Sequence, residues 1–282
     1  MSFDIFAAVT DRIISQLEQG VIPWHKPWTG TQSGAVSGAT GKPYSLLNQM
    51  LLGKSGEWYT FTQIQKLGGK VRKGEKSSMV VFWKHIPVKE KRPETGESIE
   101  HCIPMLKYFN VFHVSQCEGI EPKSIDPDQI QEIPADETAD AIISDYLLRS
   151  SVILEHVKGD DAFYSPHADR VQLPLREQFL NMAEYYSTAF HELIHSTGHS
   201  SRLNRLSGKA FFGNEEYSKE ELVAEIGAAA LLNHVGIETP SSFKNSSAYI
   251  QSWLRALQND KRLIVTASGA ASKAFDLITA TD

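Results

Sequence analysis

The stretch that decides the fold of the second half of this chain is TAFHELIHSTGH, residues 188–199. It contains His191, Glu192 and His195 in the order His-Glu-x-x-His. Residues four apart lie on the same face of an α-helix, so the two imidazoles can bind one ion. Glu192 lies beside them, where it can take a proton from a water molecule. The motif predicts a helix with one zinc ion per chain, other divalent transition metals being alternatives.

A catalytic zinc site needs a third protein ligand. No histidine follows at the short spacing of the metzincins, so a later helix is expected to supply a carboxylate. In SKEELVAEIGAAA, Glu221 and Glu225 share a helix face, whereas Glu220 is expected to point elsewhere. We predict that Glu221 binds the metal and that Glu225 orients a ligand histidine, with the reverse order left open.

The composition is that of a globular protein, with 41% hydrophobic and 22% charged residues. No run of 18 apolar residues predicts a membrane span. The N-terminus carries Asp4 and Asp11 where a secretory signal would have a basic head and an apolar run. Cys102 and Cys117 are expected to be free thiols. These features predict a cytoplasmic protein without a membrane partner.

The charge distribution divides the chain. Residues 1–120 hold 14 Lys and Arg against 10 Asp and Glu, whereas residues 121–282 hold 14 against 24. Residues 121–137 are rich in proline and acids and resemble a linker. We therefore predict an α+β protein with a domain at 1–120, a linker at 121–137 and a second domain at 138–282, since charge of opposite sign favours different partners.

Hydrophobic periodicity predicts the elements of both parts. The first contains an N-terminal helix, a short helix from Thr60 to Gly68, and a hairpin of strands at 78–88 and 105–114. The second is mostly helical with a small sheet. Its expected hairpin covers residues 161–174, and its helices cover residues 137–150, 175–197, 218–235 and 246–260, the last of which closes the domain.

The first part also carries a basic turn with aromatic residues around it. Residues 66–76 contain five Lys and Arg and one acid, Glu75. Cations that bind phosphates and rings that stack on bases are typical of single-stranded DNA binding, with weaker duplex binding also considered. Phe61, Phe82 and Trp83 alternate like core residues. The predicted DNA contacts are Lys70, Arg72, Lys73, Lys76, Trp24, Trp28, Tyr44 and Trp58.

Several long motifs resemble the ArdC-type antirestriction proteins of conjugative plasmids, whose N-terminal domain also occurs in some plasmid primases. The motifs are WHKPW, TGKPYSLLNQMLL, TFTQIQKLGGKVRKGEKSSMVVFWK, YFNVFHVSQCEGI, YYSTAFHELIHSTGH and YSKEELVAEIGAAALL. The resemblance implies a domain that binds single-stranded DNA, then a zincin-like metallopeptidase domain, and a role in protecting incoming plasmid DNA from host restriction during conjugation. It also implies zinc binding by His191, His195 and a glutamate of EELVAE, with Glu192 as the base.

Three hypotheses follow. The protein is an antirestriction protein that binds single-stranded DNA and carries a peptidase site. Alternatively, it is an intracellular metallopeptidase whose first domain recruits a protein substrate, for example a component of a restriction system. In the third hypothesis the metal site is structural or vestigial, and DNA binding provides the whole function.

Overall fold

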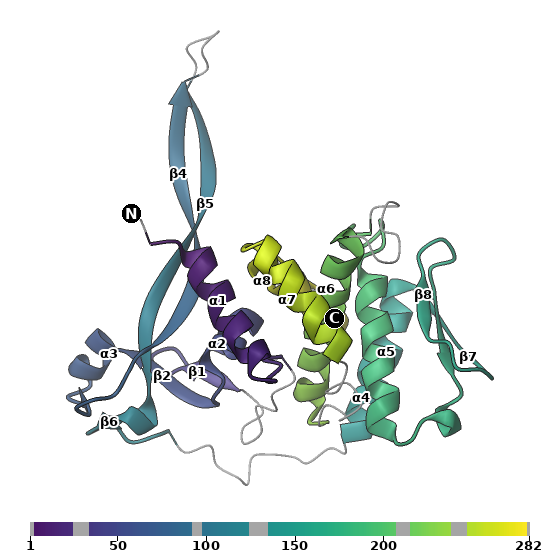
Figure 1. The fold of residues 1–282 in the computed structure, drawn as a ribbon, viewed down its shortest axis with the longest axis horizontal. Helices are drawn as coiled ribbons and strands as arrows, with labels where there is room; N and C mark the ends of the chain where they lie inside the picture. Colours follow the sequence, from purple (N-terminus) through teal and green to yellow (C-terminus); the bar gives the residue numbers. More distant parts are fainter. Residues whose placement is uncertain are drawn as a thin grey trace.

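Figure 1 shows the fold in a computed structural model. The structure describes residues 3–24, 34–91, 98–123, 135–206, 215–237 and 247–280. It is an α+β protein of two parts, as predicted: a sheet-based N-terminal part and a mostly helical C-terminal part with a small sheet.

The N-terminal part is built on a four-stranded sheet in the order β1-β2-β5-β4. Its strands are β1 (Ala35–Ser37), β2 (Gly56–Thr60), β4 (Ser78–Lys91) and β5 (Ser98–His113). A second small sheet pairs β3 (Lys70–Val71) with β6 (Cys117–Glu118), and η1 (Val114–Gln116) precedes β6. The helices of this part are α1 (Ile5–Glu18), α2 (Leu46–Leu52) and α3 (Phe61–Lys66).

Two local devices fix the elements of this part. The side chain of Thr60 accepts from the backbone N–H of Gln63, and the Gln63 side chain accepts from the backbone N–H of Thr60, which caps the start of α3. The buried amide of Asn48 on α2 bonds both the N–H and the C=O of Val81 on β4. Asn48 thereby pairs backbone groups of an edge strand that has no neighbouring strand on this side.

The C-terminal part places helices beside a three-stranded sheet in the order β7-β9-β8. The strands are β7 (Ile153–Val157), β8 (Phe163–Ser165) and β9 (Arg170–Pro174), followed by η3 (Arg176–Gln178). The helices are α4 (Ala135–Ser150), α5 (Met182–Thr197), α6 (Glu215–Val235), α7 (Ser247–Asn259) and α8 (Leu263–Thr279).

Most predicted elements are present, but several were missed: α2 and the short strands β1, β2, β3 and β6 in the N-terminal part, and β7 and α8 in the C-terminal part. The hairpin of β8 and β9 and the helix that carries the metal motif are confirmed, but α5 begins at Met182 because Asn181 caps it. Strand β7, which pairs in parallel with β9, and the last helix, α8, were not predicted. The predicted linker lies largely outside the described residues. Among the helices that the structure describes, none has the length and apolar composition of a membrane span.

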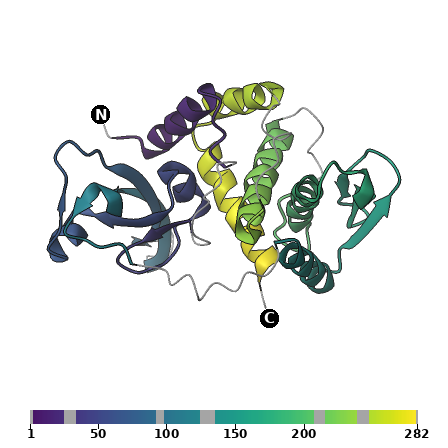
Figure 2. The ribbon, with the colours of Figure 1, turned by 90° about the horizontal axis from the view of Figure 1, so that it is seen from below.

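Helix α8 connects the two parts. It contacts α1 and α2 on one side and α4, α5 and α6 on the other, and Figure 2 shows it between the N-terminal sheet and α6. Its buried residues belong to the same hydrophobic cluster as Ile13 of α1 and Met50 of α2. At the turn before α8, the backbone C=O of Lys261 accepts a hydrogen bond from Thr10, and the amine of Lys261 lies 2.7 Å from Asp11. The two parts therefore share one core.

Arg202, which follows the metal-motif helix α5, connects the ends of α4 and α5 to the small sheet. Its guanidinium donates to the backbone C=O of Ser196 at the end of α5 and to Ser150 at the end of α4. It also makes a two-point ion pair with Asp169, in the turn between β8 and β9, which accepts a further hydrogen bond from the Tyr164 hydroxyl. One side chain therefore positions two helix ends against the small sheet.

Asp169→Asn tests this arrangement. The backbone φ of 46° at this position is one that Asn also tolerates, so the substitution removes mainly the charge. We expect the free energy of unfolding to fall by roughly 1.5–3 kcal/mol at neutral pH, because hydrogen bonds to charged groups contribute about that much. Urea unfolding of the variant and of wild type measures the difference, with the exposed Asp161→Asn as a control.

The effect should depend on pH. Burial alone would raise the pKa of Asp169, but hydrogen bonds from Arg202 and Tyr164 lower it. An acid with a lowered pKa in the folded state contributes stability above its unfolded pKa of about 3.9, and this contribution is lost as the pH falls through the folded pKa. The difference between wild type and Asp169→Asn should therefore shrink in acid. A difference that stays constant from neutral pH to acid would contradict the ion pair.

Candidate metal centre and nucleic-acid interface

The metal motif lies on α5, with both imidazoles turned toward α6. The Nε2 atoms of His191 and His195 are 3.1 Å apart, and their rings meet edge to face with centroids separated by 4.8 Å. Both side chains are 13% exposed. Glu192 is buried beside them, and its charge favours the protonated form of both imidazoles.

Glu221 of α6 completes the cluster. One carboxylate oxygen lies 3.5 Å from Nε2 of His191, and the other lies 3.4 Å from Nε2 of His195. Ligand atoms bound at about 2.1 Å to a tetrahedral ion lie roughly 3.4 Å from one another. The three side chains thus bring two nitrogens and a carboxylate together at separations that suit a divalent metal ion.

Two further carboxylates lie behind the imidazoles. Glu225, one turn after Glu221, places an oxygen 3.9 Å from Nδ1 of His191. Glu220 places an oxygen 3.4 Å from Nδ1 of His195. The expectation that Glu220 points elsewhere is therefore wrong. Because α6 is buried on more than one face, adjacent residues can both reach α5.

Arg205 holds Glu220 in place. Its guanidinium bonds both Glu220 oxygens, at 2.8 and 3.2 Å, and also donates to the Thr197 hydroxyl and to the C=O of Ile194. These last two groups belong to the final turn of α5. Arg205 therefore connects the carboxylate behind His195 to the helix that carries His195.

The carboxylates control the protonation of the cluster. Burial alone would lower the pKa of His195, but hydrogen bonds to Glu220 and Glu221 raise it to about 10. Burial likewise opposes the shift at His191, whose pKa is raised by Glu221. The pKa of Glu221 is lowered by the two imidazoles against the effect of burial. The site thus stabilises positive charge between its carboxylates, and a divalent cation supplies such charge.

The predicted basic turn is a loop that hydrogen bonds hold in place. Its four predicted DNA-binding side chains differ in whether they form an ion pair. Lys70 lies 3.4 Å from Glu118, and Arg72 lies 3.4 Å from Glu75 and also bonds the C=O of Ser115. The Gln116 amide donates to Glu75 and to the backbone of Lys76, which fastens the turn to η1. Within the described residues, Lys73 and Lys76 are exposed and form no ion pair.

The three predicted aromatic contacts that the structure describes do not form one surface. Trp24 is 1% exposed and packs against Trp253, with ring centroids 5.1 Å apart. Trp58 is 4% exposed and donates its indole N–H to the C=O of Lys54. Both rings belong to the core, so the expectation that they stack on bases does not hold. Trp28 lies outside the described residues. Tyr44 is half-buried beside Phe82.

The exposed rings belong to residues whose sequence pattern predicted core positions or that no predicted site included. Phe61, Phe82 and Trp83 are about half exposed, as are Tyr108 and Phe109 of β5. The alternation of apolar residues was correctly identified as a strand pattern. The prediction of core positions was wrong for Phe61, Phe82 and Trp83, because no other element fully covers these side chains. The available signal was the aromatic content of β4 and β5, together with the absence of Asp and Glu from residues 76–89 and 101–117.

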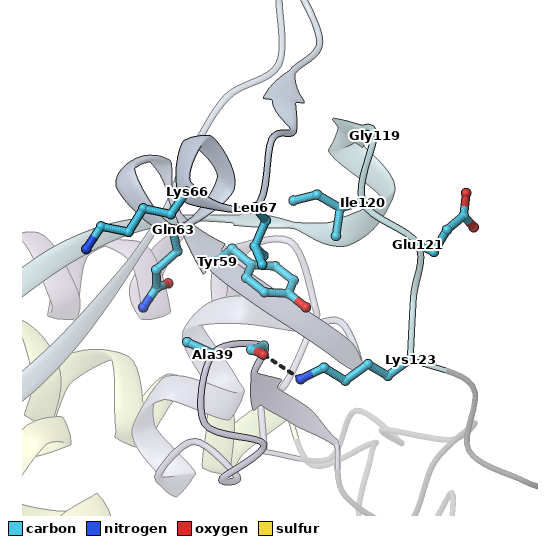
Figure 3. A pocket seen from close by; sticks show the side chains of 10 residues that line it. Ala39, Tyr59, Gln63, Lys66, Leu67, Gly119, Ile120, Glu121 and Lys123 are labelled. Carbon is cyan, nitrogen blue, oxygen red and sulfur yellow. Dashed lines mark hydrogen bonds between the residues drawn. The ribbon is translucent and has the colours of Figure 1, made fainter.

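A pocket of about 510 Å³ lies in the N-terminal part, beside α3 (Figure 3). Leu67, Ile120 and the Tyr59 ring form its apolar surface, and Lys123 closes one side by donating to the C=O of Gly38. A Cβ at Gly38 would lie 2.0 Å from the Tyr59 ring, so this position requires glycine. Burial, and then Glu57, raise the pKa of Tyr59 to about 12. The pocket shares no residue with the metal cluster.

Comparisons with known proteins cover both parts. The family model of the N-terminal domain of the anti-restriction factor ArdC matches residues 3–112, and that of a zincin-like metallopeptidase matches residues 139–270. Crystal structures of the antirestriction protein ArdC from plasmid R388, one metal-free and one Mn(II)-bound, are 35% identical and cover 98% of this chain and 97% of theirs. Their TM-scores are 0.74 and 0.75.

Curated relatives agree with this result. DNA primase TraC of Escherichia coli is 34% identical over 96% of this chain, which spans 20% of one TraC protein and 27% of another. The uncharacterized protein y4eC of Sinorhizobium fredii (strain NBRC 101917 / NGR234) is 31% identical over 97% of this chain and 91% of its own length. The chain therefore belongs to the ArdC family of antirestriction proteins, in which an N-terminal ArdC domain precedes a zincin-like domain.

Proposed function

We propose that this protein binds single-stranded DNA and protects incoming plasmid DNA from host restriction during conjugation, and that its zincin-like part is a zinc-dependent peptidase. It would act in the cytoplasm of the bacterial host or the recipient cell. The boundaries proposed for the two domains are residues 1–120 and 138–282, with 121–137 as the linker.

The observation that carries the peptidase proposal is the convergence of three metal-binding side chains from two helices. His191 and His195 face Glu221 at ligand-to-ligand separations of 3.1 to 3.5 Å. Imidazole and carboxylate groups suit Zn²⁺ and other divalent transition metals, including the Mn(II) of the related crystal structure. Glu220 and Glu225 would orient the two imidazoles.

The chemistry follows from the neighbouring side chains. When bound, the ion supplies Lewis acidity to a water molecule and to a peptide carbonyl group. Glu192 would take the proton of the attacking water and deliver it to the leaving amine nitrogen. The amine departs neutral, and the carboxylate of Glu192 is regenerated. A host protein, for example a restriction component, would be the substrate.

The observation that favours DNA binding is the exposure of Lys73 and Lys76 on a turn that hydrogen bonds hold in place. Lysines that are not engaged in an ion pair can bind phosphates without breaking an existing contact, and the nucleic acid releases its counterions. Lys70 and Arg72 remain proposed DNA contacts, although each would first have to leave its ion pair with a glutamate. Single-stranded DNA is the proposed ligand, with weaker binding of duplex DNA.

Glu220→Gln tests the metal site without removing a ligand. The substitution removes the charge behind His195 and keeps the shape of the side chain. We expect the affinity for Zn²⁺ to fall about 10- to 100-fold, as for other partners of ligand histidines. Titration calorimetry with Zn²⁺, and in parallel with Mn²⁺, measures the affinity. Glu184→Gln on the first turn of α5 is the control, and equal affinity of Glu220→Gln and wild type would contradict the proposed role.

Glu192→Gln tests the peptidase. It should keep the bound metal but lower the hydrolysis of a mixture of fluorogenic peptides at least about 100-fold, because it removes the general base. Metal content is measured on the same sample, and Glu184→Gln again serves as the control. Hydrolysis at the wild-type rate by Glu192→Gln would show that another group acts as the base.

Lys73→Ala combined with Lys76→Ala tests DNA binding. We expect weaker binding of an oligothymidylate and a slope of log affinity against log salt that is less steep by about 1.4, since two phosphate contacts are lost. The control is Lys158→Ala with Lys273→Ala, which removes the same charge from exposed positions of the zincin-like part. An unchanged slope would remove the basic turn from the DNA site.

Transfer of unmodified plasmid into a restricting host separates the three functional hypotheses. The lysine variant should protect less than wild type, and equal protection would contradict the leading proposal. Protection by Glu192→Gln at the wild-type level would indicate that the metal site is not needed for antirestriction. Peptide cleavage without salt-dependent DNA affinity would favour a peptidase that recruits protein substrates.

A further inference from the structure

The pair of strands β4 and β5 forms a long ribbon whose outer part extends away from the rest of the molecule (Figure 1). The strands are antiparallel and remain in register from the pair Ser78 and Val111 to the pair Lys91 and Ser98. A ribbon of this length exposes side chains on both faces where no other element covers it. The described side chains of the ribbon that no other element covers are therefore open to a ligand.

One face of the ribbon carries aromatic and basic residues together. Directly opposite residues of an antiparallel pair lie on the same face. Phe82 lies opposite Lys107, and Lys84 lies opposite Met105, so these four side chains share a face with Phe109, two residues from Lys107. Phe82 is 44% exposed and Phe109 is 47% exposed. Both lysines are exposed as well.

The rings on this face form a continuous row. The centroids of Phe82 and Phe109 are 5.8 Å apart in an edge-to-face contact, and the ring of Tyr44 lies 6.1 Å from that of Phe82. The row thus begins at the body of the N-terminal part and continues onto the ribbon. We name the group of Tyr44, Phe82, Lys84, Lys107 and Phe109 the stacking face.

The opposite face of the ribbon has different surroundings. Trp83 lies 6.1 Å from Phe6 of α1, and Tyr108 lies 4.9 Å from Phe3, measured between ring centroids. The N-terminal segment therefore already contacts the rings on that side. On the stacking face, by contrast, no ring from a described helix contacts Phe82 or Phe109.

The charge of the ribbon identifies the kind of ligand. Residues 76–89 and 101–117, which include the stacking-face residues of both strands, contain no Asp or Glu, although the chain as a whole has a net charge of −6; Glu90 and Glu100 lie near the far end of the ribbon. Exposed rings with interspersed cations suit a ligand with flat apolar surfaces and a regular negative charge. Single-stranded nucleic acid has both, because bases stack on aromatic rings while phosphates bind lysines. A purely apolar protein partner would gain nothing from the two lysines.

We propose that the stacking face is the surface on which single-stranded DNA places its bases, with Lys84 and Lys107 at its phosphates. This inference rests on the proposed DNA binding and adds its location and mode. Recognition by stacking tolerates any sequence, because every base has an aromatic face. It also discriminates against duplex DNA, whose bases are already stacked on one another.

The test is binding of the full chain to a fluorescein-labelled oligothymidylate, measured by fluorescence anisotropy. Phe82→Ala with Phe109→Ala should weaken binding at least about 25-fold, since each stacked ring contributes about 5-fold or more. The salt slope should stay at the wild-type value, because no phosphate contact is removed. Phe82→Trp with Phe109→Trp should restore the affinity. Phe61→Ala, at an exposed ring on α3, is the matched control and should bind as wild type.

Lys84→Ala with Lys107→Ala should instead lower the salt slope by about 1.4. If wild type binds the oligothymidylate and the phenylalanine variant binds it equally well, this inference fails and the proposed function stands. If wild type does not bind the oligothymidylate at all, the proposed function fails. An equal loss of affinity for single-stranded and duplex DNA in the phenylalanine variant would overturn stacking as the mode of binding.

Discussion

The close contact of α5 and α6 at Gly227 is the constraint on which the metal centre depends. A Cβ at Gly227 would lie 2.6 Å from Cδ1 and 2.9 Å from Cγ1 of the buried Ile194, so any other residue would force Ile194 to move and would disturb this approach of the two helices. Ile194 lies between the two histidines of the motif in the sequence, and Gly227 follows the glutamates of α6. Because helices can approach closely only where side chains are small, this one position brings carboxylates within reach of both imidazoles.

The helix α8 imposes a comparable constraint on the whole molecule. Its buried residues pack against α1 and α2 of the N-terminal part and against α6 of the zincin-like part. Neither part therefore covers its apolar surface by itself, and the region proposed to bind DNA shares a core with the metal centre. Two family models match the two parts of the chain separately, and yet these parts share a common interior.

The candidate site shows which inferences are possible from local spacing. His191, Glu192 and His195 were identifiable because helical geometry relates residues four apart without reference to the rest of the fold. Glu221 and Glu225 were predicted from the same periodicity on another helix. Glu220 was misjudged because its role arises from the crossing of α6 over α5 and from Arg205, which approaches from a loop. For the DNA surface, composition indicated basic and aromatic residues but did not tell buried rings from exposed ones.

The sequence by itself determined the α+β class, most of the helices and strands, and the residue types of the metal motif, because these depend on periodicity and caps within one segment. Only the tertiary structure decided that Trp24 and Trp58 are buried while Phe82 and Phe109 are exposed. It also decided that α8, whose serines and threonines weaken its apolar pattern, lies at the centre of the molecule. The physical reason is that burial depends on which distant segments cover a residue, and an alternating strand pattern is the same whether a face is covered or open.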